Sequence, residues 1–520
     1  MRTRWSADVV ILGSGFAGSI AAMILKKLGH QPLLVDRATH PRFAIGESST
    51  PVANRLLLDL AERYDLPALT PLAKWGTWEK TNPQLRRGKK RGFSYFHHLS
   101  EQSFQPQQNH ANELLVAASA DDLHSDTQWF RADVDQFLVQ QAQAQGVEVL
   151  DGVTIQRFLP LTNGRAWRLS GQRENKSVEI EADFILDGSG EAAALAHAFD
   201  IPSAISGIHT HSRAIFSHWN DIGSWDHWLQ THGADLQAHP FASDDAAQHH
   251  LFDGAWMWIL RFSHGVASVG IAMDPRRWPV PEHASPEEEW ETWLNRYPAV
   301  RDILGNRMPQ TPPGRVIRTG RLQRRWHQIV GNGWAMLPHT AGFVDPLHSS
   351  GIAHSLCGVE RLMRQFESAD WRQSLSKGLA EYQTAVLSEL TMIDQLVAAC
   401  YSTFHHFPLL IANSMLYFAA ATSYEKQRHL AGYNPQLRFL LAGDGEFTSA
   451  AQRILTQLES LLGNSVGTLD HSSARPSRSF SAADISAYQE LVARELQPFN
   501  HVGLCDWSGD QMYRYTAAPL

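Results

Sequence analysis

The chain has 520 residues, a length that predicts roughly two to four structural units and excludes a disordered protein or a small disulfide-bonded domain. Hydrophobic residues make up 43% of the chain, charged residues make up 19%, and the formal net charge is −8, so we expect no nucleic-acid binding. The three cysteines, Cys357, Cys400 and Cys505, are too far apart for a redox or metal motif, which predicts a cytoplasmic protein without a metal site.

The first elements expected along the chain are a strand, a helix and a second strand. The apolar, β-branched run 9–12 is typical of a buried parallel strand, an alanine-rich helix is expected over about 19–28, and the second strand covers 32–36. The N-terminal apolar run leads directly into glycines without a cleavage site, so no signal peptide is predicted.

Three glycines between the first strand and the helix have the spacing of a dinucleotide-binding turn. Gly13 permits the tight bend, Gly15 lets the backbone approach a pyrophosphate, and Gly18 lets the helix pack against the strand. Asp36 follows the second strand and is expected to accept hydrogen bonds from ribose hydroxyls. These residues together predict a dinucleotide site.

The middle and the end of the chain have different periodicities. Residues 255–262 and 267–272 alternate as two strands joined at 263–265, whereas helices are expected over 378–401 and 408–424. The helical stretches are apolar but are interrupted by polar residues, so we predict buried helices and no transmembrane segment.

Four segments in order resemble the FAD-dependent halogenases and their relatives, the geranylgeranyl reductases and aromatic hydroxylases. They are Pro41–Ser48 (PRFAIGES), Arg131–Asp135, Ala182–Gly190 and Ala341–Ile352. The resemblance implies an α/β fold in which a Rossmann-type FAD-binding domain carries an inserted antiparallel β-sheet substrate domain and a helical C-terminal region.

The same resemblance suggests domain boundaries. A discontinuous FAD-binding domain is expected over 1–200 and 305–365, the substrate-domain sheet over 201–304, and the C-terminal helical region over 366–520. The stretch 463–481, rich in Ser, Gly, Asn and Pro, is the best candidate for a linker.

The resemblance also implies which residues contact FAD. They are Gly13, Gly15, Gly18, Asp36, Arg37, Arg42, Glu47, Ser48, Arg131, Asp187, Gly188, Asp345, Pro346, Gly351 and Ile352. The chain has Pro338-His339 where relatives have Gly-Asp, and the family's aspartate holds the ribityl chain. We therefore expect loosely held FAD that arrives already reduced.

Halogenases of this family present a lysine over a tunnel from the flavin, where its ammonium group polarises hypohalous acid as a compact point charge. Lys74 matches the family's spacing and is preferred, and Lys90 is the competitor because it also precedes an aromatic strand. The paired tryptophans of the family's WxWxIP strand are present as Trp256 and Trp258, but Leu260-Arg261 replaces Ile-Pro.

The loop before the last family segment bears on the halide and the substrate. Ser349, Ser350 and Gly351 are expected to form the halide pocket with backbone amides at a helix start. Tryptophan halogenases have a glutamate where this chain has His348, so a phenol, resorcinol or pyrrole is favoured over free tryptophan. His348 is a candidate base because the charge of histidine changes near neutral pH.

The resemblance thus predicts an FAD-dependent halogenase that uses reduced FAD, oxygen and chloride or bromide on an electron-rich aromatic substrate, either free or bound to a carrier. No second nucleotide motif is visible, so a separate flavin reductase is the expected partner. The alternatives are a flavin monooxygenase that hydroxylates an aromatic or lipid-like substrate, a geranylgeranyl-reductase-like enzyme, and a flavin-binding protein without catalytic activity.

Overall fold

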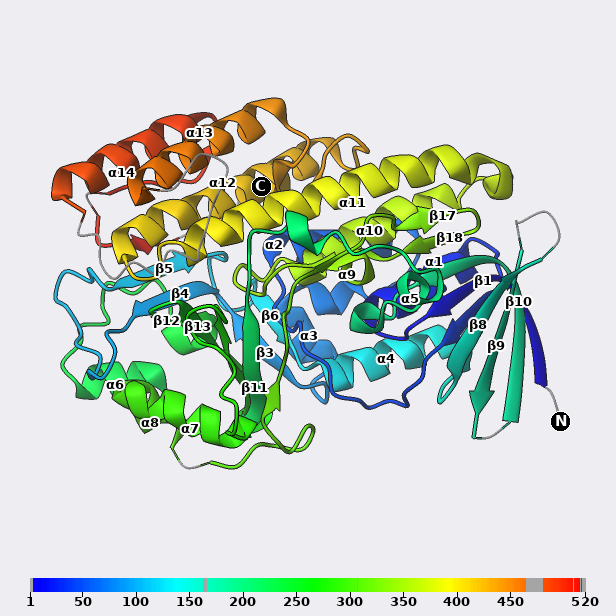
Figure 1. The fold of residues 1–520 in the computed structure, drawn as a ribbon, viewed down its shortest axis with the longest axis horizontal. Coiled ribbons are helices and arrows are strands. Elements are labelled where there is room, and N and C mark those ends of the chain that lie inside the picture. The colour runs from blue at the N-terminus through cyan, green and yellow to red at the C-terminus, as the bar shows by residue number, and fades with distance from the viewer. Residues whose placement is uncertain are drawn as a thin grey trace.

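The computed structural model describes residues 3–161, 166–174, 176–305, 307–463, 480–507, 509–514 and 516. The linker expected over 463–481 therefore lies almost entirely outside the described residues. Within the described part, two eight-stranded sheets and a layer of C-terminal helices account for most of the molecule (Figure 1).

The first sheet is the nucleotide-binding sheet. Its central strand β1 pairs in parallel with β2 on one side and with β10 on the other, and β10 pairs in parallel with β18. The strands are β1 (Thr3–Leu12), β2 (Pro32–Val35), β7 (Glu148–Leu150), β8 (Thr154–Pro160), β9 (Trp167–Arg173), β10 (Lys176–Asp187), β17 (Val330–Gly331) and β18 (Trp334–Met336). The predicted strand, helix and strand of the N-terminal unit are confirmed, with the helix α1 at Phe16–Lys27.

The second sheet lies beside the first and is largely antiparallel. Its order is β15 (Ile317–Arg318), β11 (Arg213–Asn220), β14 (Val266–Met273), β13 (Ala255–Arg261), β12 (Ala247–Phe252), β4 (Gly92–His97), β5 (Glu113–Ala117) and β20 (Met512–Tyr513). The predicted hairpin is present as β13 and β14, with Arg261 opposite Ala267. The pairs β12–β4 and β5–β20 are parallel, which the prediction of an antiparallel sheet missed.

The second sheet also draws on more of the chain than the sequence suggested. β4 and β5 fall inside the range 1–200 that was assigned to the FAD-binding domain, but their hydrogen bonds are to β12, to each other and to β20. Short-range patterns do not reveal such pairings, because the partner strands are distant in sequence. The domain boundaries themselves stay a prediction.

Two short ribbons and the helices complete the fold. The ribbons pair β3 (Arg87–Lys90) with β6 (Asp126–Trp129) and β16 (Arg324–Arg325) with β19 (Gly342–Phe343). The helices besides α1 are α2 (Pro51–Arg63), α3 (Trp75–Thr81), α4 (Arg131–Ala144), α5 (Ala194–Ala198), α6 (Trp225–Thr231), α7 (Pro286–Arg296), α8 (Pro298–Leu304), α9 (Pro338–Ala341), α10 (Gly351–Gln365), α11 (Trp371–Tyr401), α12 (Phe407–Ala431), α13 (Gly445–Leu462) and α14 (Ala482–Leu496).

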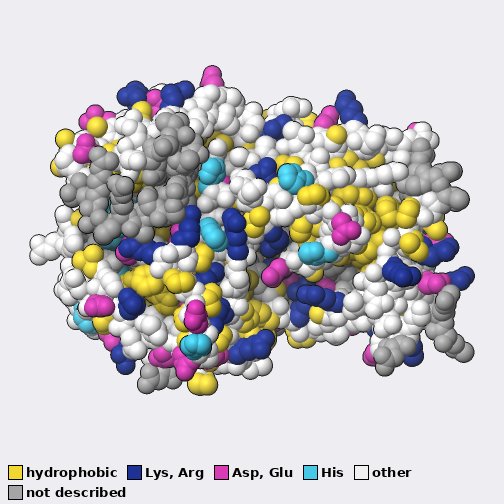
Figure 2. All heavy atoms as spheres, viewed as in Figure 1, with side chains coloured by type: hydrophobic (Ala, Val, Ile, Leu, Met, Phe, Trp, Pro, Cys, Tyr) yellow, Lys and Arg dark blue, Asp and Glu magenta, His cyan; other side chains and the backbone are white. Residues whose placement is uncertain are grey.

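The C-terminal helices α11 to α14 form a layer that runs along one side of the molecule, as predicted from the helical periodicity (Figure 1). In the part of the chain that the structure describes, the search for a helix with the length and hydropathy needed to span a bilayer finds none. On the face drawn in Figure 2, basic and acidic side chains are interspersed among apolar ones.

Candidate active site

The turn between β1 and α1 has the backbone that a dinucleotide requires. Gly13 has φ +96°, and an added Cβ would overlap the carbonyl of Gly188, while a Cβ at Gly18 would overlap the carbonyl of Gly13. Gly15 is the N-cap of α1 and has no side chain to cover the amides of the first helical turn. The three glycines therefore form a cradle that fits a pyrophosphate.

Two guanidinium groups lie beside this cradle. A Cβ added at Gly15 would lie 3.5 Å from Arg131 and 3.6 Å from Arg42, so the open side of the glycine faces both. Arg131 forms a bidentate pair with Asp135 at 2.9 and 2.8 Å and also donates to the carbonyls of Ile45 and Gly46. These bonds fix a positive charge where phosphate oxygens would lie.

Asp36 lies at the end of β2, as predicted, but its oxygens already have partners. It accepts hydrogen bonds from the backbone N and Oγ of Ser14, at 2.8 and 2.7 Å, and from the backbone N of Ala38 at 2.9 Å. Burial acts to raise the pKa of Asp36, but the bonds from Ala38 and Ser14 hold it below its usual value. A ribose hydroxyl would share the ionised carboxylate with Ser14. The neighbouring Arg37 is exposed.

Glu47 and Ser48 of the PRFAIGES segment are buried between the two sheets. Glu47 Oε1 lies 2.9 Å from Nε2 of His218 on β11, and both side chains are 2% exposed. Ser48 forms a β-bridge with Gln128, and its Oγ has no hydrogen-bond partner within the described residues. Glu47 thus links the PRFAIGES segment to the second sheet.

The end of β10 forms the next part of the site. The carboxylate of Asp187 accepts hydrogen bonds from the backbone N of Ser189 at 2.9 Å and of Leu195 at 2.8 Å, which shapes the turn at Gly188. His339 lies against this turn, with Nε2 3.2 Å from the carbonyl of Gly188. Burial lowers the pKa of His339 to about 4. At neutral pH this position therefore offers a hydrogen-bonding group without charge, where relatives have an aspartate.

The predicted halide loop leads into α10. Asp345 accepts hydrogen bonds from Ser212 Oγ at 2.6 Å and Tyr401 OH at 2.9 Å, and burial raises its pKa to about 6.

The residues after Asp345 form the start of α10. Pro346 is half-buried and Ile352 is buried. Ser349 has φ +53°, Ser350 is the N-cap of α10, and Gly351 is exposed with open space around an added Cβ. The start of α10 can therefore receive a flavin edge or an anion.

The two candidate lysines differ sharply in burial. Lys90 is 0% exposed, its Nζ donates to the carbonyl of Ser49 at 2.6 Å, and it lies 4.2 Å from the ring centroid of Phe93. Side chains alternate along β3, so Lys89 points the other way and pairs with acidic residues. Lys74 is half-buried at the N-cap of α3.

Asp126 faces Lys90 across the β3–β6 ribbon. The two residues are directly opposite in the antiparallel register, and Asn54 Nδ2 donates to Asp126 Oδ1 at 2.5 Å. Burial raises the pKa of Asp126 to about 6, against the charges of Lys74 and Lys90, and burial lowers the pKa of Lys90 to about 7 although Asp126 opposes it. The sequence analysis missed Asp126, because only the strand pairing brings it to the lysine.

A group of aromatic rings in contact connects the lysine to the halide loop. Phe93, beside Lys90, lies 6.1 Å from Tyr417, and the Tyr417 ring stacks on His348 at 4.3 Å with an interplanar angle of 5°. Burial lowers the pKa of His348 to about 3, so the imidazole is neutral at physiological pH, contrary to the expectation that its charge changes near neutrality. Its Nδ1 has no hydrogen-bond partner in the described part of the chain.

A small pocket with a cavity volume of about 30 Å³ lies next to these rings. Its lining is mostly apolar and comes from β4, β5, α2, α12, the turn at Phe439 and the segment after β20: Thr50, Pro51, Val52, Phe93, Val116, Ala118, Tyr417, Phe418, Ala421, Thr422, Glu425, Phe439 and Thr516. A cavity of this size holds about one water molecule, so an aromatic ring would enter it only if lining side chains moved.

The predicted tryptophan pair lies on one face of β13. The rings of Trp256 and Trp258 are 5.8 Å apart, and their Nε1 atoms donate to Tyr401 OH at 3.1 Å and Ser268 Oγ at 3.2 Å. Both rings are buried in the core, where they form part of the wall between the two sheets.

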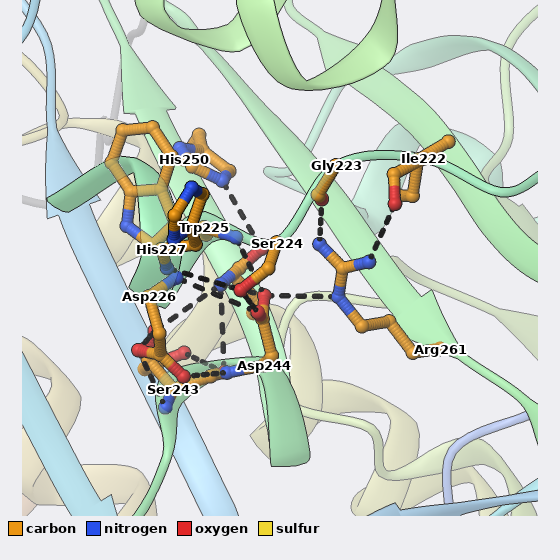
Figure 3. A network of polar contacts seen from close by, with 12 residues as sticks. Ile222, Gly223, Ser224, Trp225, Asp226, His227, Ser243, Asp244, His250 and Arg261 are labelled. Carbon is orange, nitrogen blue, oxygen red and sulfur yellow. Dashed lines mark hydrogen bonds and ion pairs between the residues drawn. The ribbon is translucent and has the colours of Figure 1, made fainter. Parts of the chain in front are cut away.

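Arg261, at the end of the same strand, has a structural role that accounts for the departure from the family's proline. Its Nε lies 2.9 Å from Asp244 Oδ1, and its other nitrogens donate to the carbonyls of Gly223 and Ile222 (Figure 3). Asp244 also accepts from Ser224 Oγ and from the backbone N of Trp225. Arg261 therefore links β13 to the loop before α6 rather than contacting the cofactor.

The cradle, the fixed guanidinium groups and the buried lysine beside an aromatic pocket define an FAD-dependent oxidoreductase that acts on a small molecule. The family model for tryptophan halogenase matches residues 8–77 and 87–406, so the chain belongs to this family of flavin-dependent halogenases.

Characterised relatives agree with this assignment. The tetracycline 7-halogenase of Kitasatospora aureofaciens is 29% identical over 413 residues, which cover 77% of this chain and 71% of the relative. The monodechloroaminopyrrolnitrin halogenase PrnC of Pseudomonas fluorescens is 26% identical over 418 residues, which cover 77% of this chain and 69% of the relative.

Among solved structures, the halogenase PltM in complex with phloroglucinol and FAD superimposes with a TM-score of 0.83 at 22% identity, and the match covers 98% of this chain and 99% of that one. The likeness extends over both sheets and the helical layer. It supports the predicted α/β architecture, and FAD is the cofactor of the family.

Proposed function

We propose that the protein halogenates an electron-rich aromatic compound, of phenol, resorcinol, pyrrole or indole type, with reduced FAD, oxygen and chloride or bromide. The observation that carries the proposal is the fully buried Nζ of Lys90, which lies beside the aromatic pocket and faces Asp126. An ammonium group in such a place is costly to bury and is typical of a catalytic role.

The residues around the β1–α1 turn fit the cofactor. The amides at Gly15 and the guanidinium groups of Arg131 and Arg42 would hold the pyrophosphate, and the turn at Gly188 together with the start of α10 would receive the flavin. When bound and reduced, FAD supplies the electrons with which oxygen converts halide into hypohalous acid.

Lys90 would then hold and polarise hypohalous acid by donating a hydrogen bond from its ammonium group. The aromatic carbon forms a bond to halogen and loses its proton, and the hydroxyl of the hypohalous acid leaves as water, so one molecule of water is released for each halogen transferred. The carbonyl of Ser49 orients the lysine, at 2.6 Å from Nζ. A desolvated point charge acts strongly here because little water screens it.

The lining of the pocket suits an aromatic substrate, because it is mostly apolar and includes the rings of Phe93, Tyr417 and Phe418. Relatives include a tetracycline 7-halogenase and a brominase that acts on pyrrole-2-carbonyl bound to a peptidyl carrier protein. The neutral His348 could accept a hydrogen bond from a phenol at Nδ1.

A separate flavin reductase is the proposed source of reduced FAD. The sequence shows one dinucleotide motif, the N-terminal turn, and FAD would occupy it, so NADH would be bound by another protein. The uncharged His339, in place of an aspartate, favours FAD that exchanges readily between the two proteins. The reducing cytoplasm is the proposed location, because Cys357, Cys400 and Cys505 are all free thiols.

A reconstituted assay tests the function and the choice of lysine. The purified chain, a flavin reductase, NADH, FAD, oxygen and bromide are incubated with phenols, pyrroles and indoles, and products are analysed by mass spectrometry. We expect a brominated product that is lost at least 100-fold in Lys90→Ala and reduced far less in Lys74→Ala. An oxygen adduct would indicate hydroxylation, and a gain of two hydrogens would indicate reduction of a double bond.

A further inference from the structure

Three side chains from separate parts of the chain converge at the edge of the second sheet. His110 lies in the loop before β5, Glu113 is the first residue of β5, and His239 lies in the loop between α6 and β12. One oxygen of Glu113, Oε2, lies 3.1 Å from His110 Nδ1 and 2.9 Å from His239 Nε2. The three ligand atoms all lie within 4.8 Å of one another.

All three side chains are buried. The exposed fractions are 9% for His110, 1% for Glu113 and 3% for His239. A buried carboxylate is unfavourable unless an opposite charge or several hydrogen bonds compensate it. Hydrogen bonds with the two imidazoles compensate part of this cost, and a cation bound by the three groups would add an opposite charge.

The distances suit a tetrahedral metal ion. Zinc binds histidine nitrogen and carboxylate oxygen at about 2.0–2.2 Å, so two ligands at a tetrahedral angle are about 3.4 Å apart. The distances of 3.1 and 2.9 Å from Glu113 Oε2 would lengthen slightly when a metal enters, and the two imidazole nitrogens, which lie within 4.8 Å of each other, would settle about 3.4 Å apart. Two nitrogens and one oxygen form a donor set that suits Zn²⁺, Co²⁺ and related ions, with water as a fourth ligand.

The cluster and the lysine lie near opposite ends of the β4–β5 pair. Glu113 is opposite Phe96 at one end of the β4–β5 pair, whereas Ala117 is opposite Gly92 at the other end, close to where β3 ends at Lys90. Four residues of strand, about 13 Å, separate the two ends. An ion bound at Glu113 would therefore connect loops and would not touch the reacting atoms.

We propose that His110, Glu113 and His239 bind a divalent transition-metal ion, with Zn²⁺ as the primary candidate, and that the ion joins the loop before β5 to the loop after α6. The sequence analysis predicted no metal site, because it considered cysteine motifs and these three residues have no motif spacing. The proposal stands independently of the halogenase activity.

Metal binding is tested on the full-length chain after removal of any affinity tag and treatment with a chelator. We expect Zn²⁺ to bind with a stoichiometry of one and micromolar or tighter affinity by calorimetry, and to raise Tm by about 2–4 °C. We expect Co²⁺ to give the intense visible absorption of a tetrahedral site. Absence of both signals at a tenfold molar excess of metal would overturn the proposal.

Two variants separate a metal site from a hydrogen-bonded cluster. His110→Gln and His239→Gln keep an amide that can donate to Glu113 but remove a ligand, so we expect each to lose the Co²⁺ absorption and the Zn²⁺-dependent rise in Tm. The control is His124→Gln, which changes an exposed histidine that pairs with Asp121. Unchanged Co²⁺ absorption in both ligand variants would show that the metal binds elsewhere.

Discussion

At the scale of single residues, Asp126 is expected to set the protonation state of Lys90. The groups whose charge acts on this pair are Lys74, His249 and Tyr417, which come from α3, β12 and α12. In the proposed role, lysine carries the positive charge that polarises hypohalous acid only as an ammonium group, which exists below its pKa. Burial lowers that pKa to about 7, and the carboxylate of Asp126 keeps it from falling further.

Asp126→Asn is therefore expected to shift the alkaline limb of the pH–rate profile toward lower pH by at least one unit, so that turnover at pH 7 falls about fivefold or more and recovers in acid. The amide that replaces the carboxylate can still accept the bond from Asn54, so folding is preserved. The measurement is kcat for bromination between pH 5 and 9. Asp122→Asn, which alters the outward partner of Lys89, is the control. An unshifted limb would show that Asp126 does not act on the lysine.

Single residues also show what sequence reasoning can and cannot reach. The glycine turn and Asp36 were predicted correctly in position, because they follow one another within one βαβ unit. The preference for Lys74 over Lys90 rested on spacing, and the spacing carries no information about which side chain β3 turns inward. The pKa of His348 depends on burial against Tyr417, about seventy residues away, and no local pattern contains that contact.

At the scale of elements, the N-terminus of α1 is expected to decide FAD affinity. Gly15 has φ −68° and ψ 175°, which alanine adopts without strain, and an added methyl group would make only ordinary contacts with Arg131 and Arg42. Gly15→Ala should therefore fold normally, while the methyl group occupies the space that a pyrophosphate oxygen needs.

We expect Gly15→Ala to weaken FAD binding at least tenfold, measured by quenching of flavin fluorescence, with Tm of the apoprotein changed by less than about 2 °C. Gly207→Ala is the control, since an added Cβ there meets open space on the surface. Equal affinity in the variant and the parent would mean that the cofactor does not approach this turn.

The pairing of elements explains where the fold prediction succeeded and where it stopped. Helices α11 and α12 and the β13–β14 hairpin were predictable, because each has its own periodicity or a short connection. The entry of β4 and β5 into the second sheet was not, since β4 pairs with β12 more than 150 residues later. The family resemblance predicted the FAD-binding unit, the inserted sheet and the helical region, but it did not predict that β4 and β5 belong to the second sheet.

At the scale of the whole molecule, one buried arginine joins the helical layer to the nucleotide-binding unit. Arg428 on α12 contacts Asp59 on α2 at 2.6 Å and Glu360 on α10 at 2.8 Å, and its side chain is 4% exposed. Arg428→Ala would remove one of two guanidinium partners from each carboxylate, because Asp59 also pairs with Arg55 and the deeply buried Glu360 also pairs with Arg364.

We expect Arg428→Ala to reduce the free energy of unfolding by about 2–3 kcal/mol, measured by urea denaturation. The matched control is Arg453→Ala, which breaks an ion pair with Glu495 on the surface of the helical layer and should cost less than about 1 kcal/mol. If Arg428→Ala has the same urea midpoint as the parent, the ion pairs of Arg428 do not hold the layers together.

The short strand β20 gives the pocket an unusual dependence on synthesis. Thr516 lines the pocket and donates through Oγ1 to the carbonyl of Ala117 at 2.8 Å, across a sequence separation of 399 residues. During translation, β20 and Thr516 leave the ribosome about 400 residues after β5, so this side of the pocket stays open while the intervening elements are made. A nascent chain can therefore complete its dinucleotide turn long before the pocket has its full lining.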